Sequence, residues 1–561
     1  MKKIVLYILT SAMFMMNTSC SDYLAEESRT SIDKNKYMLN AAEAENVLLG
    51  VYRNMVSDAM YGYHLSILFT LGTDIAQVEG STNENFRIIP TNSFTTNQAE
   101  IQSTWAILYN SIYNANDFLE GLEQKMVDYS SADKELATIY MAEARGLRAL
   151  YYFELVRRYG NIALITNTAM SKQLPSSFVQ EDPVKVYEFI EQDLKYAVEN
   201  LPYAVDDKLR ANKSFRLSKG SALGLLAKVY ATWAGAPIRD ISKWEMAAKT
   251  AQILIESNKH GLLDNYEQLW KNSGAGTWNP IESLIEVSFY SPTATNGAAD
   301  PIGRIGKWNG VRATAIAGER GSNAANVKVV HTFVLDWRNF PEDLRRDISV
   351  ANYQYNPTKQ LWVGTDAAAA ANDADPTKTQ RAKQNYTPGK WDTEKYVPQS
   401  NKLINNDRSN VNWYVLRYAD VLLLYAEALN EWKQGPTNEA YTAINMVRRR
   451  GYGLPIYSAS NLADVPTGLD VQGFRDAVRK ERAFELAFEG DRKLDLIRWG
   501  VYYETVKATA QKLGIWWITA GSPNYAVATP GYTTKNKHEL FPIPQREMDI
   551  MPQFDQNPGW K

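Results

Sequence analysis

The sequence has very few residues that could cross-link the chain or hold a metal ion. It contains a single cysteine, Cys20, so an internal disulfide cannot form. Its histidines stand far apart, at His64, His260, His331 and His538. A histidine-based metal site would need ligands from distant segments, so neither a metal nor another cofactor is expected.

The chain also lacks an excess of charge of either sign. Its formal net charge is −2, and 22% of its residues are charged. This balance indicates neither nucleic acid nor an acidic membrane surface as a partner. With 561 residues, the chain is long enough for several domains or for one large α-helical domain.

Motifs typical of enzymes are missing as well. The sequence has no G-x-S-x-G elbow, no H-E-x-x-H motif, no Walker loop and no glycine-rich dinucleotide fingerprint. Oxygen ligands for calcium could come from one polar stretch, at Asp366, Asn372, Asp373 and Asp375. Their spacing lacks the EF-hand pattern and is typical of a solvated loop. We therefore expect neither an enzyme nor a metal protein.

An apolar run near the N-terminus has the form of an export signal. In MKKIVLYILTSAMFMMNTSC, two lysines precede an apolar stretch that is too short to span a bilayer comfortably. The cysteine that follows resembles a bacterial lipoprotein box, and the acidic residues after it resemble a surface-export signal. We expect residues 1–19 to be a signal peptide, Cys20 to carry lipid and residues 20–40 to form a tether. The alternative is an ordinary secretory signal with an incidental cysteine.

Apolar residues recur at helical spacing through much of the chain. The pattern i, i+3, i+4, i+7 predicts helices over residues 42–56, 104–122, 135–160 and 186–201. Gly160 and Pro202 end two of them. Strand patterns are rare, and only residues 283–291 suggest a short hairpin. The fold class is therefore mainly α.

The predicted helices form related pairs. Small residues near a tyrosine mark the first helix of a pair, and closely spaced alanines mark the second. The pairs are 220–235 with 242–257, 416–432 with 437–449, and 144–160 with 186–201. This arrangement resembles the tetratricopeptide repeat, a helix–turn–helix unit of roughly 34 residues. The repeats are degenerate, which favours a scaffold over a regular array.

Long irregular segments interrupt this scaffold. We interpret residues 41–561 as a single domain that combines a helical scaffold with loop-rich excursions. The scaffold covers about 41–270 and 411–500, and the excursions cover about 271–410 and 501–561. Loops of this length are unusual in a compact protein unless they have a function, so we expect ligand binding there.

The segment ERAFELAFEGDRKLDLIRWG, residues 481–500, could suggest an acid/base or metal site. Glu481, Glu485 and Glu489 form one row at helical spacing, beside an apolar stripe. Glu489 is expected to pair with Arg492 and Lys493, and Asp495 with Arg498. A di-metal bundle would need Glu-x-x-His motifs, and a glycosidase needs two carboxylates across a cleft. We therefore predict a packed, ion-paired helix.

The irregular segments carry many aromatic residues. Sugars have apolar C–H faces, and carbohydrate sites stack rings on those faces and surround them with polar groups. The candidates for stacking and hydrogen bonding are Trp278, Tyr290, Trp308, Arg312 and Trp337. For any one tryptophan, the alternative role is to anchor its loop to the scaffold.

Together these segments resemble the SusD/RagB family of outer-membrane lipoproteins of Bacteroidetes. The resemblance begins at CSDYL and continues through WAILYNSIYNANDFLEGL, ALYYFELVRRYGNIALIT, DLKYAVENLP, SALGLLAKVYATWAG and VLRYADVLLLYAEALNE. Its most specific parts are ERAFELAFEGDRKLDLIRWG and LFPIPQREMDIMPQFDQNPGW. It spans nearly the whole chain and is weakest in the aromatic excursions.

The resemblance implies a lipid-anchored protein at the outer cell surface that is not an enzyme. Family members cap a SusC-type TonB-dependent transporter and capture a nutrient, usually a glycan, for import. Their ligand sites come from early loops and the middle excursion, which adds Asp74, Asn85, Phe86 and Arg87 as candidates here. The alternatives are a peptide ligand, as in the RagB branch, and a helical-fold glycoside hydrolase.

Overall fold

The structure is a computed structural model of the full chain. It describes residues 37–78, 85–213, 215–289, 291, 302–355, 360–362, 386–514 and 530–561. Several predicted features lie outside the described residues: the signal peptide 1–19, Cys20 with the tether as far as residue 36, Tyr290, and the acidic stretch at 366–375.

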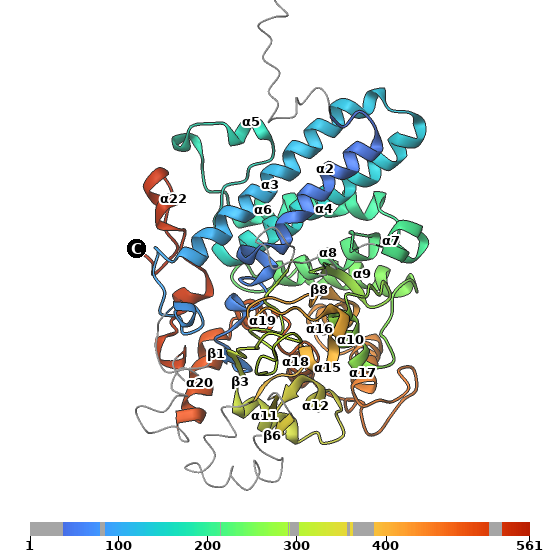
Figure 1. The fold of residues 1–561 in the computed structure, drawn as a ribbon, viewed down its shortest axis with the longest axis vertical. Helices are drawn as coiled ribbons and strands as arrows, with labels where there is room; N and C mark the ends of the chain where they lie inside the picture. The colour runs from blue at the N-terminus through green and yellow to red at the C-terminus, as the bar shows by residue number, and fades with distance from the viewer. Residues whose placement is uncertain are drawn as a thin grey trace, which may run out of the picture.

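Long helices build the scaffold, as the apolar periodicity predicts. They are α2 Ala41–Arg53, α3 Ala99–Lys125, α4 Ser131–Tyr159, α6 Pro183–Asn200, α8 Lys219–Ala234, α9 Lys243–Glu256, α16 Tyr418–Lys433, α17 Asn438–Gly451 and α18 Val471–Glu485. Successive helices pack on one another, α3 on α4, α4 on α6, α6 on α8, α8 on α9, α9 on α16, and α16 on α17 and α18. Figure 1 shows α2, α3, α4 and α6 together at one end of the molecule. The mainly α, repeat-like fold is confirmed.

Local sequence explains where several of these helices begin and end. Helix α8 starts with a capping box between Ser218 and Ser221. Helix α4 ends at Gly160, whose φ of 68° favours glycine, and α6 begins with Pro183 in its first turn. A Cβ on Gly224 of α8 would lie 2.9 Å from the Leu284 side chain. Small residues in α8 therefore let neighbouring segments approach closely.

Shorter elements fill the loop-rich segments and the connections. The short α-helices are α5 Thr168–Ser171, α7 Lys208–Lys213, α10 Tyr266–Ala275, α11 His331–Arg338, α12 Arg345–Ser349, α15 Thr393–Tyr396, α19 Arg492–Arg498, α20 Tyr502–Gly514 and α22 Gln545–Ile550. The single turns of other helix types are η4 Asn54–Val56, η5 Asp58–Gly62, η6 Leu68–Thr70, η7 Asn85–Arg87, η8 Met126–Asp128, η9 Pro175–Ser177, η10 Ala204–Asp206, η11 Gln399–Asn401 and η12 Asn536–Glu539.

The strands of the described residues form two-stranded antiparallel ladders. These are β1 Ala76–Val78 with β3 Val327–Val329, β2 Ser283–Val287 with β8 Trp413–Arg417, β4 Val350–Ala351 with β7 Thr387–Pro388, and β5 Tyr353–Tyr355 with β6 Gln360–Trp362. The predicted local hairpin at 283–291 is wrong, because β2 pairs with the distant β8. The β1–β3 ladder joins the early loop to the middle excursion (Figure 1).

Buried tryptophans anchor the middle excursion to the scaffold. Trp337 of α11 is 0% exposed and stacks on Phe484 of α18, with ring centroids 4.6 Å apart. Trp391 stacks on Trp413 of β8 at 5.1 Å. These tryptophans therefore anchor their loops to the scaffold, which was the alternative to stacking on a ligand.

The segment 481–500 is not one helix. Helix α18 ends at Glu485, Phe488 and Gly490 adopt positive φ values of 66° and 100°, and α19 begins at Arg492. The predicted pairing of Glu489 with Arg492 and Lys493 is wrong, because Arg492 pairs with Asp74 and Lys493 Nζ has no hydrogen-bond partner among the described residues. Glu489 instead accepts hydrogen bonds from Lys390 and Arg417.

Ion pairs of this segment are buried in the core, which confirms its packing role. Glu485 is 0% exposed and accepts from Arg450 Nη2 at 2.6 Å, Arg345 Nη1 at 3.0 Å and Arg417 Nη1 at 3.1 Å. Burial alone would raise the pKa of Glu485, but Arg450, Arg417 and Arg345 outweigh it and lower the pKa to about 2. The carboxylate therefore stays ionised, and its role is to pair with the three arginines in the core.

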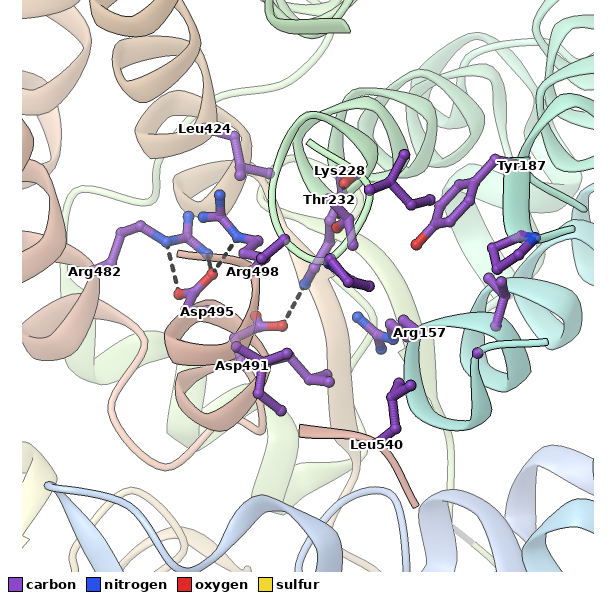
Figure 2. A pocket seen from close by; sticks show the side chains of 18 residues that line it. Arg157, Tyr187, Lys228, Thr232, Leu424, Arg482, Asp491, Asp495, Arg498 and Leu540 are labelled. Carbon is purple, nitrogen blue, oxygen red and sulfur yellow. Dashed lines mark hydrogen bonds and ion pairs between the residues drawn. The ribbon is translucent and has the colours of Figure 1, made fainter. Parts of the chain in front are cut away.

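A second buried network lies beside it (Figure 2). Asp495 accepts from Arg482 Nε at 2.8 Å and from Arg498 Nε at 2.9 Å, so the predicted Asp495–Arg498 pair is confirmed. Lys228 of α8 donates to Asp491 at 2.6 Å. These pairs tie α19 to α18 and α8.

Glu286 of β2 gives a prediction for the pH dependence of stability. It is buried beside Ser283 Oγ at 2.7 Å and Asn412 Nδ2 at 2.9 Å, and no ion pair of the described residues includes it. Burial raises its pKa from 4.5 to about 8, so between these values the folded state holds a proton that the unfolded state releases. The free energy of unfolding should therefore fall with rising pH, by about 1.4 kcal/mol per unit at most.

Urea unfolding of the wild type and Glu286→Gln between pH 5 and pH 8 tests this prediction. Glutamine fills the same space and does not titrate, so the variant should gain stability relative to the wild type as pH rises. An equal pH slope in both proteins would contradict it.

Candidate functional site

Three segments that are far apart in sequence meet next to the β1–β3 ladder. The Arg304 amide donates to the Gly62 carbonyl at 3.0 Å, which fixes the turn 302–308 against η5. Gly303 and Ser409 exchange backbone hydrogen bonds at 3.2 and 2.8 Å, which adds the loop 405–409. Side chains from the early loop, the middle excursion and the segment before β8 can therefore form one site.

Three aromatic rings form the aromatic cluster, defined as Tyr63, Phe86 and Trp308. Trp308 lies between the other two, 4.9 Å from Tyr63 and 5.1 Å from Phe86 between ring centroids. The Phe86 contact is edge-to-face, a favourable geometry for aromatic pairs. Tyr63 is buried, whereas Phe86 and Trp308 are half-buried. Phe86 and Trp308 are therefore not fully covered by the rest of the described residues.

Two acidic and two basic residues form the polar rim, defined as Asp58, Arg304, Asp407 and Arg408. The Trp308 indole N–H donates to Asp407 at 2.5 Å, and Arg304 donates to both Asp407 at 2.6 Å and Asp58 at 3.1 Å. Arg408 holds Asp58 through two hydrogen bonds of 2.6 and 2.7 Å. The side chains of the rim remain 21–41% exposed.

The rings and the rim are joined by the Arg304 guanidinium. Its central carbon lies 5.0 Å from the Tyr63 ring centroid and 5.3 Å from that of Trp308. These are cation–π distances. Because the same guanidinium pairs with both rim carboxylates, the orientation of the Trp308 ring and the positions of the rim charges are linked.

The turn before Trp308 depends on one glycine. Gly306 has a φ of 80°, and a Cβ there would lie 2.6 Å from the Thr393 side chain. Its amide donates to Asn309 Oδ1 at 2.8 Å. This turn directs the chain so that the Trp308 carbonyl accepts from the amide of Val327 at the start of β3.

This arrangement suits a ligand that has both apolar faces and many hydroxyl groups. The rings offer flat apolar surface, and each large aromatic side chain can bury about 150–250 Å². The rim offers carboxylate oxygens as acceptors and guanidinium groups as donors, which match both functions of a hydroxyl group. A carbohydrate combines these properties.

Some of the predicted site residues come together here. Phe86 and Trp308 are part of the aromatic cluster, and the Arg87 guanidinium lies 4.4 Å from the Phe86 ring centroid. Asn85 begins the same turn, η7, and only its backbone is described.

Other predicted residues lie elsewhere. Asp74 accepts two hydrogen bonds from Arg492 of α19, at 2.9 and 2.6 Å. Trp278 is half-buried, donates to the Arg210 carbonyl at 2.7 Å and packs on Phe215. Arg312 is exposed, and its carbonyl accepts from the Tyr355 amide of β5.

Trp337 requires a correction. A ring with 0% exposure that is stacked on Phe484 offers no surface to a ligand. Its loop position made it a stacking candidate, but it belongs to helix α11 and fills the core.

The site also contains residues that sequence reasoning missed: Tyr63, Asp58, Arg304, Asp407 and Arg408. They stand in three separate segments, and no periodicity or spacing connects them. The one available signal was the pair Asp407–Arg408 in the polar stretch NNDRSN between two apolar segments.

The described residues contain neither a candidate metal cluster nor a candidate membrane span. No group of three or more His, Cys, Asp and Glu among them is placed to hold a metal ion. No helix in these ranges is long and apolar enough to span a membrane.

The fold and the sequence have clear relatives. The SusD family profile matches residues 330–560, and a profile described as starch-binding and associating with the outer membrane matches residues 22–231. The crystal structure of a SusD homolog from Bacteroides thetaiotaomicron is 67% identical, with a TM-score of 0.90, over 95% of this chain and 100% of that chain. A laminarin-binding SusD-like protein is 26% identical, with a TM-score of 0.65, over 93% and 99%. SusD-like protein P25 of Formosa agariphila is 26% identical over 95% of this chain and 94% of its own.

Proposed function

The chain belongs to the SusD family, and we propose from this premise that it is a cell-surface glycan-binding lipoprotein. It captures an oligosaccharide or polysaccharide on the aromatic cluster and passes it to a SusC-type TonB-dependent transporter for import. The observation that carries the proposal is the half-buried Trp308 ring beside the partly exposed polar rim.

The binding surface is preorganised. The indole of Trp308 is held by Asp407 and flanked by Phe86 and Tyr63, so its ring is oriented before a sugar arrives. Little conformational entropy is then lost when the sugar stacks. Rim residues already share hydrogen bonds, and sugar hydroxyls can insert among them or bridge through water.

A glucan is the first ligand to test, because one relative is a laminarin-binding protein. Isothermal titration calorimetry of the mature chain should measure laminarin, starch, xylan, mannan and a set of short peptides under one condition. Binding of at least one glycan and of no peptide supports the proposal. Peptide binding alone would favour the RagB-like alternative, and release of free sugar during the titration would favour the hydrolase.

The lipid anchor is a second part of the proposal and has its own test. We expect Cys20→Ala, produced with its full signal in a Bacteroides host, to leave the membrane fraction, because the acyl chains that hold the protein there have no attachment site. Incorporation of an alkyne-labelled fatty acid into the wild type and not into the variant would support lipidation. Equal membrane retention of both proteins would contradict it.

A further inference from the structure

A buried ammonium group on α19 has no hydrogen-bond partner. Lys493 is 4% exposed, and its Nζ has no partner among the described residues. The rings of Tyr502 and Phe541 lie 5.3 and 5.8 Å from Nζ. Burial and, to a smaller extent, the positive charge of Arg158 lower the pKa of Lys493 to about 7. An unpaired buried charge is costly, so its surroundings call for an explanation.

Lys493 lines a small cavity. The cavity has a volume of about 20 Å³, enough for one small solvent species. Its polar lining comes from α4, α19 and η12, and consists of Arg157, Arg158, Lys493, His538 and Glu539. Apolar side chains complete the wall.

The lining is rich in hydrogen-bond donors. Arg157 donates to Glu154 at 2.6 Å, and Arg158 pairs with the same group, so one carboxylate pairs with two guanidinium groups. His538 accepts the Lys535 amide at Nδ1, and burial lowers its pKa to about 3, which leaves a neutral ring with its proton on Nε2.

Glu539 is the one carboxyl group in the lining. Burial raises its pKa, and Arg239 partly opposes the shift. No ion pair of the described residues joins it to Lys493. An acceptor with negative charge is therefore the species that this cavity lacks.

We propose that the cavity binds a small inorganic anion of the halide type, chloride under natural conditions, on Lys493 Nζ. A pocket of about 400 Å³ lies next to it, and Ile497 and Glu539 line both. Arg157 also lines a further cavity between α4 and α19, which Figure 2 shows from close by.

The anion would secure the C-terminal segment. The Phe541 amide, next to the cavity, donates to the Arg158 carbonyl at 2.7 Å, and Asn557 donates to the carbonyls of Tyr159 and Phe541 at 2.9 and 2.7 Å. Lys493 of α19 and Arg158 at the end of α4 are both positively charged. An anion between them would offset this repulsion.

Crystals of the mature protein soaked in sodium bromide test the proposal directly. We expect an anomalous difference peak at hydrogen-bond distance from Lys493 Nζ in the wild type, and no peak in Lys493→Met, which keeps the volume of the side chain and removes its charge. A wild-type cavity that holds only water, with no anomalous signal, would overturn the proposal.

Thermal unfolding supplies an independent readout in solution. At pH 6 and equal ionic strength, chloride should raise the unfolding midpoint by about 2 °C relative to gluconate, which is too large for the cavity. The difference should vanish at pH 9, where Lys493 is neutral, and in Lys493→Met. Lys537 lines the neighbouring pocket of about 400 Å³ and lies over the Trp560 ring, so Lys537→Met should keep the chloride effect. An identical chloride effect in Lys493→Met would count against the site, and if that variant does not fold, the bromide crystal decides.

Discussion

Replacement of Trp308 by alanine is expected to weaken glycan binding at least about tenfold, a loss of about 1.4 kcal/mol. The substitution removes the central ring of the aromatic cluster and leaves Asp407 without the indole N–H. Calorimetry with the best glycan of the panel measures the change. The effect should appear as lost affinity with little change in the unfolding temperature, because Trp308 is half-buried.

Trp278→Ala is the matched control for this variant. Trp278 is also half-buried and in a loop, but it packs on Phe215 and binds the Arg210 carbonyl. Its removal should leave glycan affinity within about twofold of the wild type, a difference of roughly 0.4 kcal/mol. If Trp278→Ala loses affinity and Trp308→Ala keeps it, the binding surface has been placed on the wrong tryptophan.

Replacement of Glu485 by alanine is expected to lower the free energy of unfolding by about 3–5 kcal/mol. The carboxylate is 0% exposed and accepts from Arg345, Arg417 and Arg450. Its removal leaves the three guanidinium groups buried with one acceptor fewer, in a protein whose total stability is of the order of 5–15 kcal/mol. Chemical denaturation of the purified variant measures the loss.

Glu245→Ala provides the comparison at the surface. Glu245 pairs with Lys249 one helical turn away, and both side chains are at least 42% exposed. Exposed pairs of this kind contribute about 0.3–0.5 kcal/mol, so this variant should unfold almost like the wild type. Equal, small losses in both variants would show that the buried network contributes much less than its geometry indicates.

The scaffold could be predicted because its determinants are local. Helix α4 ends at Gly160 and α6 begins after Asp182 with Pro183, as apolar spacing and capping preferences require. The break in segment 481–500 was harder to predict. Positive φ at Phe488 depends on how Glu489 reaches Arg417 of β8, a contact between distant parts of the chain.

The site could be predicted only in part, for the same reason. Loop position and ring chemistry selected Trp308, and the family resemblance selected Phe86. The loop argument selected Trp337 equally, and long-range packing decides which ring is covered. Arg304 and Asp58 meet through folding of segments that have no common periodicity. Loop geometry therefore determines the candidate site, and sequence spacing does not describe it.

A crystal structure of the mature protein with the tightest-binding glycan of the panel would show whether Trp308 and the polar rim hold the ligand. We expect a sugar ring stacked on Trp308, with its hydroxyl groups hydrogen-bonded to residues of the polar rim such as Asp407 or Arg408. A glycan bound at another surface, with Trp308 and the rim unchanged and free of ligand, would contradict it.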